Sequence, residues 1–111
     1  MLIETRLTAD NQWYLDAFIK SGDSSKALID KTLLHPAGEW CHVAFVVDNG
    51  KMDTYVGGKH ELAGDVTFSP FKTGRTSIGV RMNKVYWFKG AIARIRVTPK
   101  NLSPSEFTMA K

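Results

Sequence analysis

The sequence predicts an all-β protein, folded as an antiparallel sandwich or barrel. Short runs of β-branched and aromatic residues recur along the 111 residues, and Gly, Asn, Asp and Pro separate them. No long window shows helical periodicity, so the runs indicate strands rather than helices. The length suits a single domain over residues 1–111, because no linker, repeat or low-complexity tract divides the chain.

The first half of the chain contains four candidate strands, at residues 2–7, 13–19, 26–34 and 40–48. Residues 2–7 place Glu4 and Arg6 on one face and Ile3 on the other, as expected for a strand. The glycine-containing segment "SGDSS" forms the turn between the second and third candidates.

The strand expected at residues 40–48 is nearly all apolar, which is typical of a strand buried on both faces. We therefore expect Trp40 to fill the core and Cys41 to be a small buried hydrophobe rather than a nucleophile. A single cysteine cannot form an internal disulfide. We interpret His42 as a hydrogen-bonded histidine of the sheet.

The second half begins with a hairpin signal at Asn49–Gly50, and a further turn follows at Gly57–Gly58. The remaining candidate strands are residues 52–56, 65–71, 76–80 and 88–97. Near the end, Ser103, Pro104 and Glu106 occupy the N-cap, first and third positions of a capping box. This pattern predicts a short C-terminal helix.

Charge divides the chain into two unlike parts. From Lys72 to Lys100 there are eight basic residues and no acidic ones, whereas the first 71 residues lean acidic. The net charge of +4 therefore conceals a polarised molecule. Such a basic stretch either forms a solvated sheet face or attracts an anionic partner.

Five motifs in series resemble a known family. The segments "GEWCHVAFVVD", "MDTYVGGK", "TSIGV", "FKGAIARIRV" and "LSPSEF" follow one another between residues 38 and 107. In this order they resemble the C-terminal part of a laminin-G-like domain of the concanavalin A-like lectin/glucanase superfamily. The resemblance implies a jelly-roll β-sandwich with a core strand from Phe88 onward, in which Ala91, Ala93, Ile95 and Val97 are structural.

The N-terminal portion of such a domain has at most 37 residues here, so the resemblance also implies a shortened and incomplete sandwich. An incomplete sandwich exposes strand edges or an apolar face, and these usually find a partner. We therefore expect a homo-oligomer, with a dimer favoured.

The resemblance implies carbohydrate binding, protein binding or β-glucan hydrolysis. Hydrolysis would need paired carboxylates at a fixed spacing on one strand. The nearest acids, Glu61 and Asp65, have the wrong spacing and are expected in a loop. We therefore expect a non-catalytic, lectin-like binding module without a cofactor. Related domains often bind calcium, and Asp48 is a weak candidate ligand because one carboxylate makes a poor calcium site.

The preferred hypothesis is recognition of carbohydrate, with acidic glycans favoured by the basic half of the chain. The candidate ligand-binding residues are aromatic platforms with polar neighbours: Arg81, Asn83, Lys84, Tyr86, Trp87, Trp13 and Tyr14. Since Tyr86, Trp87 and Phe88 cannot all face inward from one strand, Trp87 is either a core residue or part of the site.

Two alternatives stay open. A structural or oligomerising module without a small ligand would bury these aromatics at an interface. Single-stranded nucleic acid could bind the basic aromatic segment by stacking, although no nucleic-acid-binding motif is present.

The sequence contains neither a membrane span nor an export signal, because Glu4 and Arg6 interrupt the apolar N-terminus. We therefore expect a cytoplasmic protein if the chain is complete, and an extracellular one if it is part of a longer exported protein.

Overall fold

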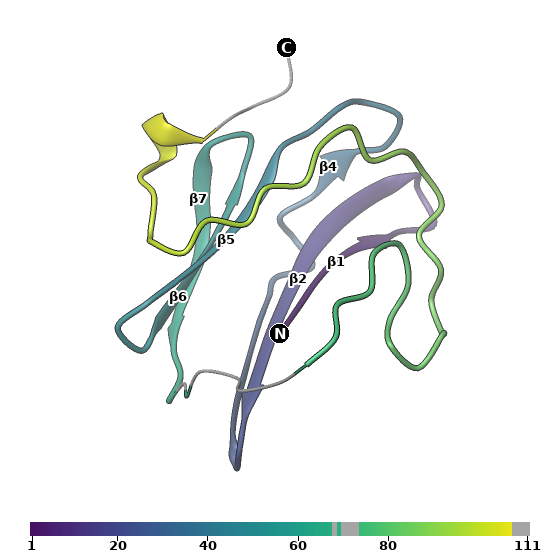
Figure 1. Ribbon diagram of the computed structural model, residues 1–111. Helices are drawn as coiled ribbons and strands as arrows, with labels where there is room; N and C mark the ends of the chain where they lie inside the picture. The colour runs from purple at the N-terminus through teal and green to yellow at the C-terminus, as the bar shows by residue number, and fades with distance from the viewer. Residues whose placement is uncertain (68, 70–73, 108–111) are drawn as a thin grey trace.

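The fold is a β-sandwich of two antiparallel sheets (Figure 1). The computed structural model of the chain describes residues 1–67, 69 and 74–107. Sheet A contains β1 (Leu2–Leu7), β2 (Gln12–Ser21), β3 (Ser24–Ile29) and the short β4 (His35–Pro36). Sheet B contains β5 (Val43–Asp48), β6 (Lys51–Val56) and β7 (Lys59–Asp65). This architecture confirms the all-β sandwich that the sequence predicts.

The two hairpin turns that the sequence predicts are present. Asn49 and Gly50, with φ of 47° and 77°, join β5 to β6, and Gly57 and Gly58, with φ of 58° and 80°, join β6 to β7. These left-handed backbone values match the twist of a tight antiparallel hairpin, which explains why glycine occurs in both turns. β6 pairs with both neighbours, and its register against β7 has one irregularity between Thr54 and Tyr55.

The core lies between the two sheets. Every second residue of β2 points inward, and Ala17 and Ile19 have no exposed surface. Leu28 from β3, Met52 from β6 and Val66 just after β7 complete the buried cluster. At Gly64 the sheets approach so closely that a Cβ atom would lie 2.9 Å from the Leu28 Cδ2 atom.

Several expected strand limits are wrong. β3 ends at Ile29 because Asp30 bonds the backbone N–H of Thr32 at 2.8 Å and forms a turn. β5 begins only at Val43, and its residues from Val43 to Val47 are half-buried rather than buried on both faces. Residues 59–65, expected to contain a loop at Glu61 and Asp65, form β7 instead.

The three residues before β5 also depart from expectation. Trp40 is 65% exposed and Cys41 is exposed, so neither fills the core. Both precede the strand, where no neighbouring strand of the described chain covers them. His42 stacks on the Phe107 ring, and its Nδ1 atom is buried without a hydrogen-bond partner among the described residues. Burial lowers the pKa of His42.

The C-terminal third contains the largest departure. The described residues after Asp65 include no strand, although strands were expected at residues 76–80 and 88–97. The expected strand at residues 65–71 lies partly outside the described residues, and its first residue ends β7. The side chains expected in the core are exposed instead, among them Phe88, Ile95 and Val97. Alternating apolar residues favour a strand, but they do not determine which strand it pairs with, and without a partner no strand forms.

The chain ends on a single 3₁₀ turn, η1 (Pro104–Glu106), rather than an α-helix. The capping box is present as predicted, with Glu106 Oε1 accepting from the Ser103 backbone N–H at 3.1 Å. Among the described residues, no helix is long and apolar enough to cross a membrane.

Candidate functional site

The outer face of sheet A carries an unusual concentration of charge. The side chains of Glu4 and Arg6 on β1 lie opposite Asp16 and Tyr14 on β2, on the face turned away from the core. Leu2 and Phe18 form the next pair along the same face. Alternation along both strands therefore places charged groups beside apolar ones on one surface.

A loop over residues 79–88, which we call the aromatic loop, lies at this face. Its ends meet where the Phe88 N–H donates to the Gly79 carbonyl at 2.7 Å. Inside it, the Lys84 N–H donates to the Arg81 carbonyl at 2.8 Å, and Asn83 Oδ1 accepts a longer bond from the Val85 N–H at 3.4 Å. These bonds close the loop upon itself and fix the direction in which Arg81 projects.

Arg81 joins the aromatic loop to the sheet. Its guanidinium forms a two-point ion pair with Glu4, in which Nη2 lies 2.8 Å from Oε2 and Nε donates to Oε1. The hydrogen bond from Arg81 is the main cause that lowers the pKa of Glu4, and the charges of Arg81 and Arg6 lower it further. The same pair raises the pKa of Arg81, so both groups are ionised at neutral pH.

A second ion pair continues the network across the strands. Arg6 Nε lies 2.7 Å from Asp16 Oδ2, and Arg6 Nη2 lies 3.6 Å from Glu4 Oε2. Asp16 is buried, at 7% exposure, and this pairing compensates its charge. Two guanidinium groups and two carboxylates thus alternate over a short distance with no net charge.

Three members of this network, Arg6, Asp16 and Arg81, form one wall of a hollow of about 360 Å³. The lining residues are Leu2, Arg6, Asp16, Phe18, Ala27 and Arg81. Apolar side chains therefore make the floor beside the charged wall. A concave apolar surface with a few convergent polar groups is the usual setting for a small ligand. We call it the sheet A pocket.

One aromatic ring extends the sheet A pocket toward solvent, and a second exposed ring follows it in the aromatic loop. The Arg81 guanidinium carbon lies 4.9 Å from the centre of the Tyr86 ring, so Tyr86 is connected to the wall of the pocket. Tyr86 is 76% exposed and Trp87 is 70% exposed. Trp87 is therefore not a core residue, and both rings are available for stacking.

Most of the predicted ligand-binding residues lie in the aromatic loop or on the outer face of sheet A, and Trp13 does not. Arg81, Asn83, Lys84, Tyr86 and Trp87 share the aromatic loop, and Tyr14 lies on the outer face opposite Arg6.

Trp13 has a different environment. Its Nε1 donates to the Pro36 carbonyl at 3.2 Å, and its ring centre lies 4.6 Å from that of His35. His35 Nε2 in turn lies 2.6 Å from Glu61 Oε1 on β7 and so links the two sheets. Trp13 is thus held in a contact that supports the sandwich.

Sequence reasoning missed five residues that line the pocket, namely Leu2, Arg6, Asp16, Phe18 and Ala27, and it missed Glu4, which pairs with Arg81. A signal for the charged residues exists in the strand alternation, because Glu4 and Arg6 share one face of "LIETRL" and Asp16 interrupts the apolar run "WYLDAFI". An acid inside an apolar strand indicates a buried partner of opposite charge.

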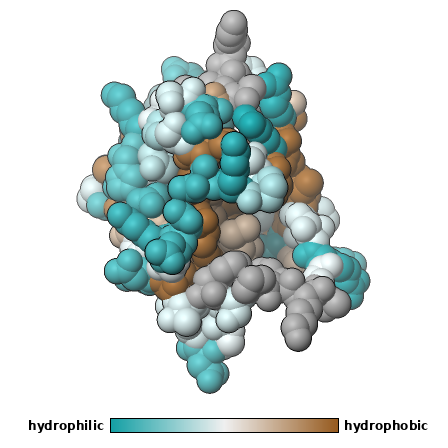
Figure 2. Space-filling view, turned by 60° about the vertical axis from the view of Figure 1, so that its left-hand side comes forward, coloured by the Kyte–Doolittle hydropathy of each residue, from teal (hydrophilic) through white to brown (hydrophobic). Residues whose placement is uncertain are grey.

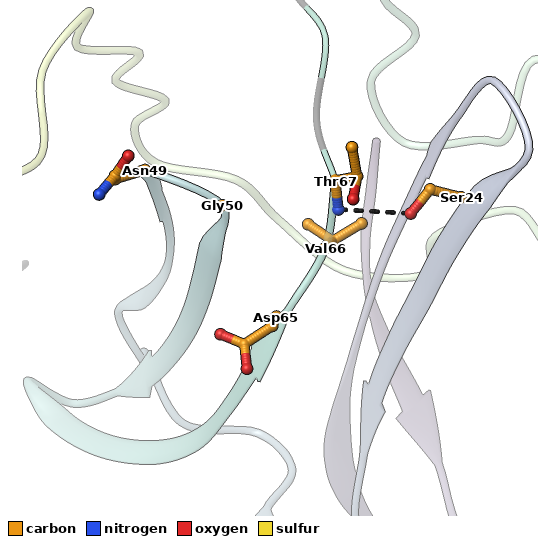
Figure 3. Close-up of a pocket in the computed structure, with 6 residues that line it drawn as sticks. All are labelled: Ser24, Asn49, Gly50, Asp65, Val66 and Thr67. Atoms are coloured by element: carbon orange, nitrogen blue, oxygen red, sulfur yellow. Dashed lines mark hydrogen bonds between the residues drawn. The ribbon is translucent and has the colours of Figure 1, made fainter.

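A second hollow, of about 570 Å³, lies where the turn ending β5 approaches the β2–β3 hairpin. Figure 3 shows the Asn49 and Asp65 side chains on one side of it and Ser24 on the other. The Thr67 N–H donates to Ser24 Oγ at 3.3 Å across the gap. This hollow contains none of the predicted site residues.

Metal ligands do not cluster in the part of the chain that the structure describes. No three His, Cys, Asp or Glu side chains within residues 1–67, 69 and 74–107 are arranged to hold an ion. The weak calcium candidate, Asp48, accepts a hydrogen bond from Asn101 Nδ2 at 3.0 Å. Cys41 is exposed as a residue, yet neighbouring groups partly desolvate its thiol and so raise its pKa, which disfavours the thiolate that a nucleophile or metal ligand requires.

Comparison with known protein families places the chain in a family. A model of a laminin-G-like family, described as the concanavalin A-like lectin/glucanases superfamily, matches residues 3–107. The match includes both sheets, the aromatic loop and the C-terminal turn, and it extends further toward the N-terminus than the five motifs do. Searches of curated proteins and of solved structures gave no match.

Proposed function

The chain belongs to the concanavalin A-like lectin/glucanase superfamily, and we propose that it is a non-catalytic carbohydrate-binding module. Its ligand site is the sheet A pocket together with Tyr86 and Trp87. The observation that carries this proposal is the Arg81 side chain, which lines the pocket and contacts both Glu4 on β1 and the exposed Tyr86 ring.

Sugars present two chemical surfaces, and this site has a counterpart for each. The C–H face of a pyranose ring packs on an aromatic ring, and Tyr86 and Trp87 offer such rings in solvent. Sugar hydroxyls both donate and accept hydrogen bonds. The carboxylates of Glu4 and Asp16 accept such bonds, and the guanidinium groups of Arg6 and Arg81 donate them.

Charge outside the pocket favours an acidic glycan. At the pocket, the charges of the two ion pairs cancel. A carboxylate on the ligand would therefore have to compete with Glu4 and Asp16 for the two arginines. Lys84 and Lys89 are exposed at the aromatic loop and beside it. They would attract the acidic groups of a longer chain while a neutral sugar unit occupies the pocket.

We also propose that the protein does not hydrolyse its carbohydrate ligand. A glycosidase of this superfamily type needs one carboxylate as an acid and another as a nucleophile or base. Glu4 and Asp16 both face guanidinium groups, and the lowered pKa of Glu4 makes it a poor proton donor. We therefore expect no hydrolysis of β-glucans.

A glycan array with neutral and acidic oligosaccharides at low salt tests the proposal. We expect wild-type protein to bind acidic glycans, and Tyr86→Ala combined with Trp87→Ala to reduce the signal roughly tenfold through the loss of stacking. Trp40→Ala is the matched control, because Trp40 is equally exposed but lies outside the site. A folded wild-type protein that binds no glycan would exclude the proposal.

Two additions to the array separate related hypotheses. We propose that binding needs no calcium, so a chelator should leave the signal unchanged. Single-stranded oligonucleotides test the nucleic-acid alternative, which requires an affinity that falls steeply with added salt.

A further inference from the structure

Strand β1 is an edge of sheet A among the strands that the structure describes. It pairs with β2 alone, and its six residues do so without an irregularity. Next to the strand, the Thr8 N–H donates to the Gln12 carbonyl at 2.7 Å. Hydrogen-bonded pairs alternate along an antiparallel ladder, so the backbone groups of the even-numbered residues of β1 point toward β2. Those of the odd-numbered residues, Ile3, Thr5 and Leu7, therefore point toward the other edge.

This edge of β1 is open within the described part of the chain. No backbone hydrogen bond from another described segment reaches it. The aromatic loop does contact β1, but the contact joins the side chains of Arg81 and Glu4 on the outer face of the sheet. The backbone donors and acceptors at the edge are therefore available to a further strand.

The inner face of β1 is also poorly covered. Ile3 lies opposite the fully buried Ala17 and so belongs to this face, yet it is 42% exposed. Leu7, on the same face, is 68% exposed. Figure 2 shows that apolar side chains reach the surface in the middle of one face and along its right-hand margin, between hydrophilic ones. The two sheets thus leave apolar groups beside the open edge of β1 that a further strand would cover.

The other outer strands of the described sheets are less suited to pairing. β3 contains Lys26, and lysine is a residue with which natural edge strands avoid pairing. The register of β7 against β6 has an irregularity. At the two ends of β5, Phe107 stacks on His42 and Asn101 bonds Asp48. β1 has none of these features, because it carries no lysine, no proline and no bulge.

The sequence of β1 is complementary to itself. When two antiparallel strands pair about a two-fold axis, residues of the same face lie opposite each other. An axis through Glu4 or through Arg6 would place two like charges opposite each other, which is destabilising. An axis through Thr5 places Glu4 of one copy opposite Arg6 of the other, and Ile3 opposite Leu7. Charge and apolar contact therefore favour the same single register.

We propose that two copies of this chain form a dimer by antiparallel pairing of their β1 strands, with the two-fold axis at Thr5. The interface is isologous, because the same strand of each copy gives and receives the hydrogen bonds. It joins the two copies of sheet A into one continuous sheet and covers Ile3 and Leu7. The ion pair between Arg81 and Glu4 within each copy lies on the outer face and is compatible with this pairing.

The two-fold axis has a consequence for the sheet A pocket. Glu4 and Arg6 share the outer face with the pocket, and the pairing sets them side by side across the axis. Both pockets therefore open on the same side of the joined sheet. This consequence rests on the proposed function, since two linked sites would bind one long glycan more tightly than either site alone. The dimer itself is tested without any sugar, so its failure and the failure of carbohydrate binding are separate results.

Sedimentation equilibrium and amide hydrogen exchange followed by NMR test the dimer in wild-type protein. We expect dimerisation, with amide exchange at Ile3, Thr5 and Leu7 becoming slower as the protein concentration rises. The amides of Glu4 and Arg6 bond to β2 in the monomer already, so their exchange should depend far less on concentration. A protein that stays monomeric would overturn the proposal, and so would a dimer in which the three odd-numbered amides exchange as fast as in the monomer.

Proline at position 5 separates the open edge from the rest of the sheet. Thr5→Pro removes an amide proton that points to the open edge and leaves the bonds to β2 in place, so the monomer should still fold. Dimerisation should weaken at least about tenfold. Thr5→Val is the matched control, because it keeps both the amide and a β-branched side chain, and it should leave the dimer intact. An unchanged dimer in folded Thr5→Pro would overturn the proposal.

Leu7→Lys decides the matter if Thr5→Pro does not fold. It replaces the apolar contact with Ile3 of the other copy by a residue that opposes edge pairing, so dimerisation should again weaken about tenfold. Leu34→Lys makes the same substitution at an exposed leucine outside β1 and should leave the dimer intact. Equal effects of the two lysine variants would place the interface elsewhere and overturn the proposal.

Discussion

Arg81 and Glu4, 77 residues apart in the sequence, form a two-point ion pair that holds the aromatic loop against the outer face of sheet A. The pair fixes the relative position of the β1 strand and the exposed Tyr86 ring. Both the charged wall of the sheet A pocket and its aromatic rim therefore depend on the same contact.

This ion pair predicts a specific dependence of stability on pH. The pKa of Glu4 is held below its ordinary value of 4.5, chiefly by the Arg81 hydrogen bond. A carboxylate with a lowered pKa in the folded state stabilises the protein above pH 4.5 and loses that contribution as the pH falls through its folded pKa. Glu4→Gln should therefore lower the free energy of unfolding at pH 7 by up to about 1 kcal/mol. At pH 3 the loss should be smaller than at pH 7.

Urea unfolding of wild type and Glu4→Gln at the two pH values measures this difference. Glu39→Gln, at an exposed position, is the control. Equal losses at pH 7 and pH 3 would show that the charge of Glu4 is not what stabilises the contact.

The sequence predicted features that depend on local chemistry. The hairpin at Asn49–Gly50 formed because both residues adopt positive φ, and the Ser103 capping box formed because its partners are three residues apart. The Arg81–Glu4 contact could not be predicted in this way, because it depends on where a loop crosses a sheet. For the same reason, the apolar alternation from Ala91 to Val97 indicated a strand but not the edge with which it would pair.

His42 predicts a second pH effect of different origin. Burial lowers the pKa of His42 below its ordinary value of 6.5, so the neutral ring is favoured in the folded protein. The folded state is then stabilised above pH 6.5 and loses this contribution as the pH falls through the lowered pKa. His42→Phe should preserve the stacking on Phe107 and remove the unpartnered Nδ1 atom.

We expect His42→Phe to unfold at the same or a higher urea concentration at pH 7, with a gain of about 1 kcal/mol or less. Between pH 7 and pH 5 its stability should change less than that of wild type. A steeper loss in the variant would contradict the assignment of this pH dependence to His42.

Gly64 predicts a steric effect at the closest approach of the sheets. A Cβ atom there would lie 2.9 Å from both Leu28 Cδ2 and Lys26 Cε. The lysine can move aside, but Leu28 is buried and must shift within the core. Gly64→Ala should therefore destabilise the fold by about 1 kcal/mol or more. Gly74→Ala, where no atom lies within 4 Å, should not, and thermal unfolding of both variants compares them.

The small size of the core predicts a strong contrast between two isoleucines. Ile19 has no exposed surface and packs between the sheets, whereas Ile78 is 61% exposed. Ile19→Ala should lower the free energy of unfolding by about 2–5 kcal/mol, because it leaves a cavity. Ile78→Ala should change it by less than about 0.5 kcal/mol. Similar losses in chemical denaturation would mean that residue 78 is covered in solution.

Two residues of the aromatic loop adopt a backbone conformation that is unfavourable for residues other than glycine. Lys84 and Tyr86 adopt left-handed φ values of 61° and 57°, a region that glycine enters freely and other residues enter at roughly 1 kcal/mol each. Glycine at either position would relax the backbone and raise stability, yet it would remove the cation or the ring. Selection for thermal stability alone should therefore drift toward glycine here, while selection for ligand recognition should hold both side chains in place. Directed evolution under selection for thermal stability, and separately under selection for ligand binding, followed by sequencing of positions 84 and 86, would test this expectation.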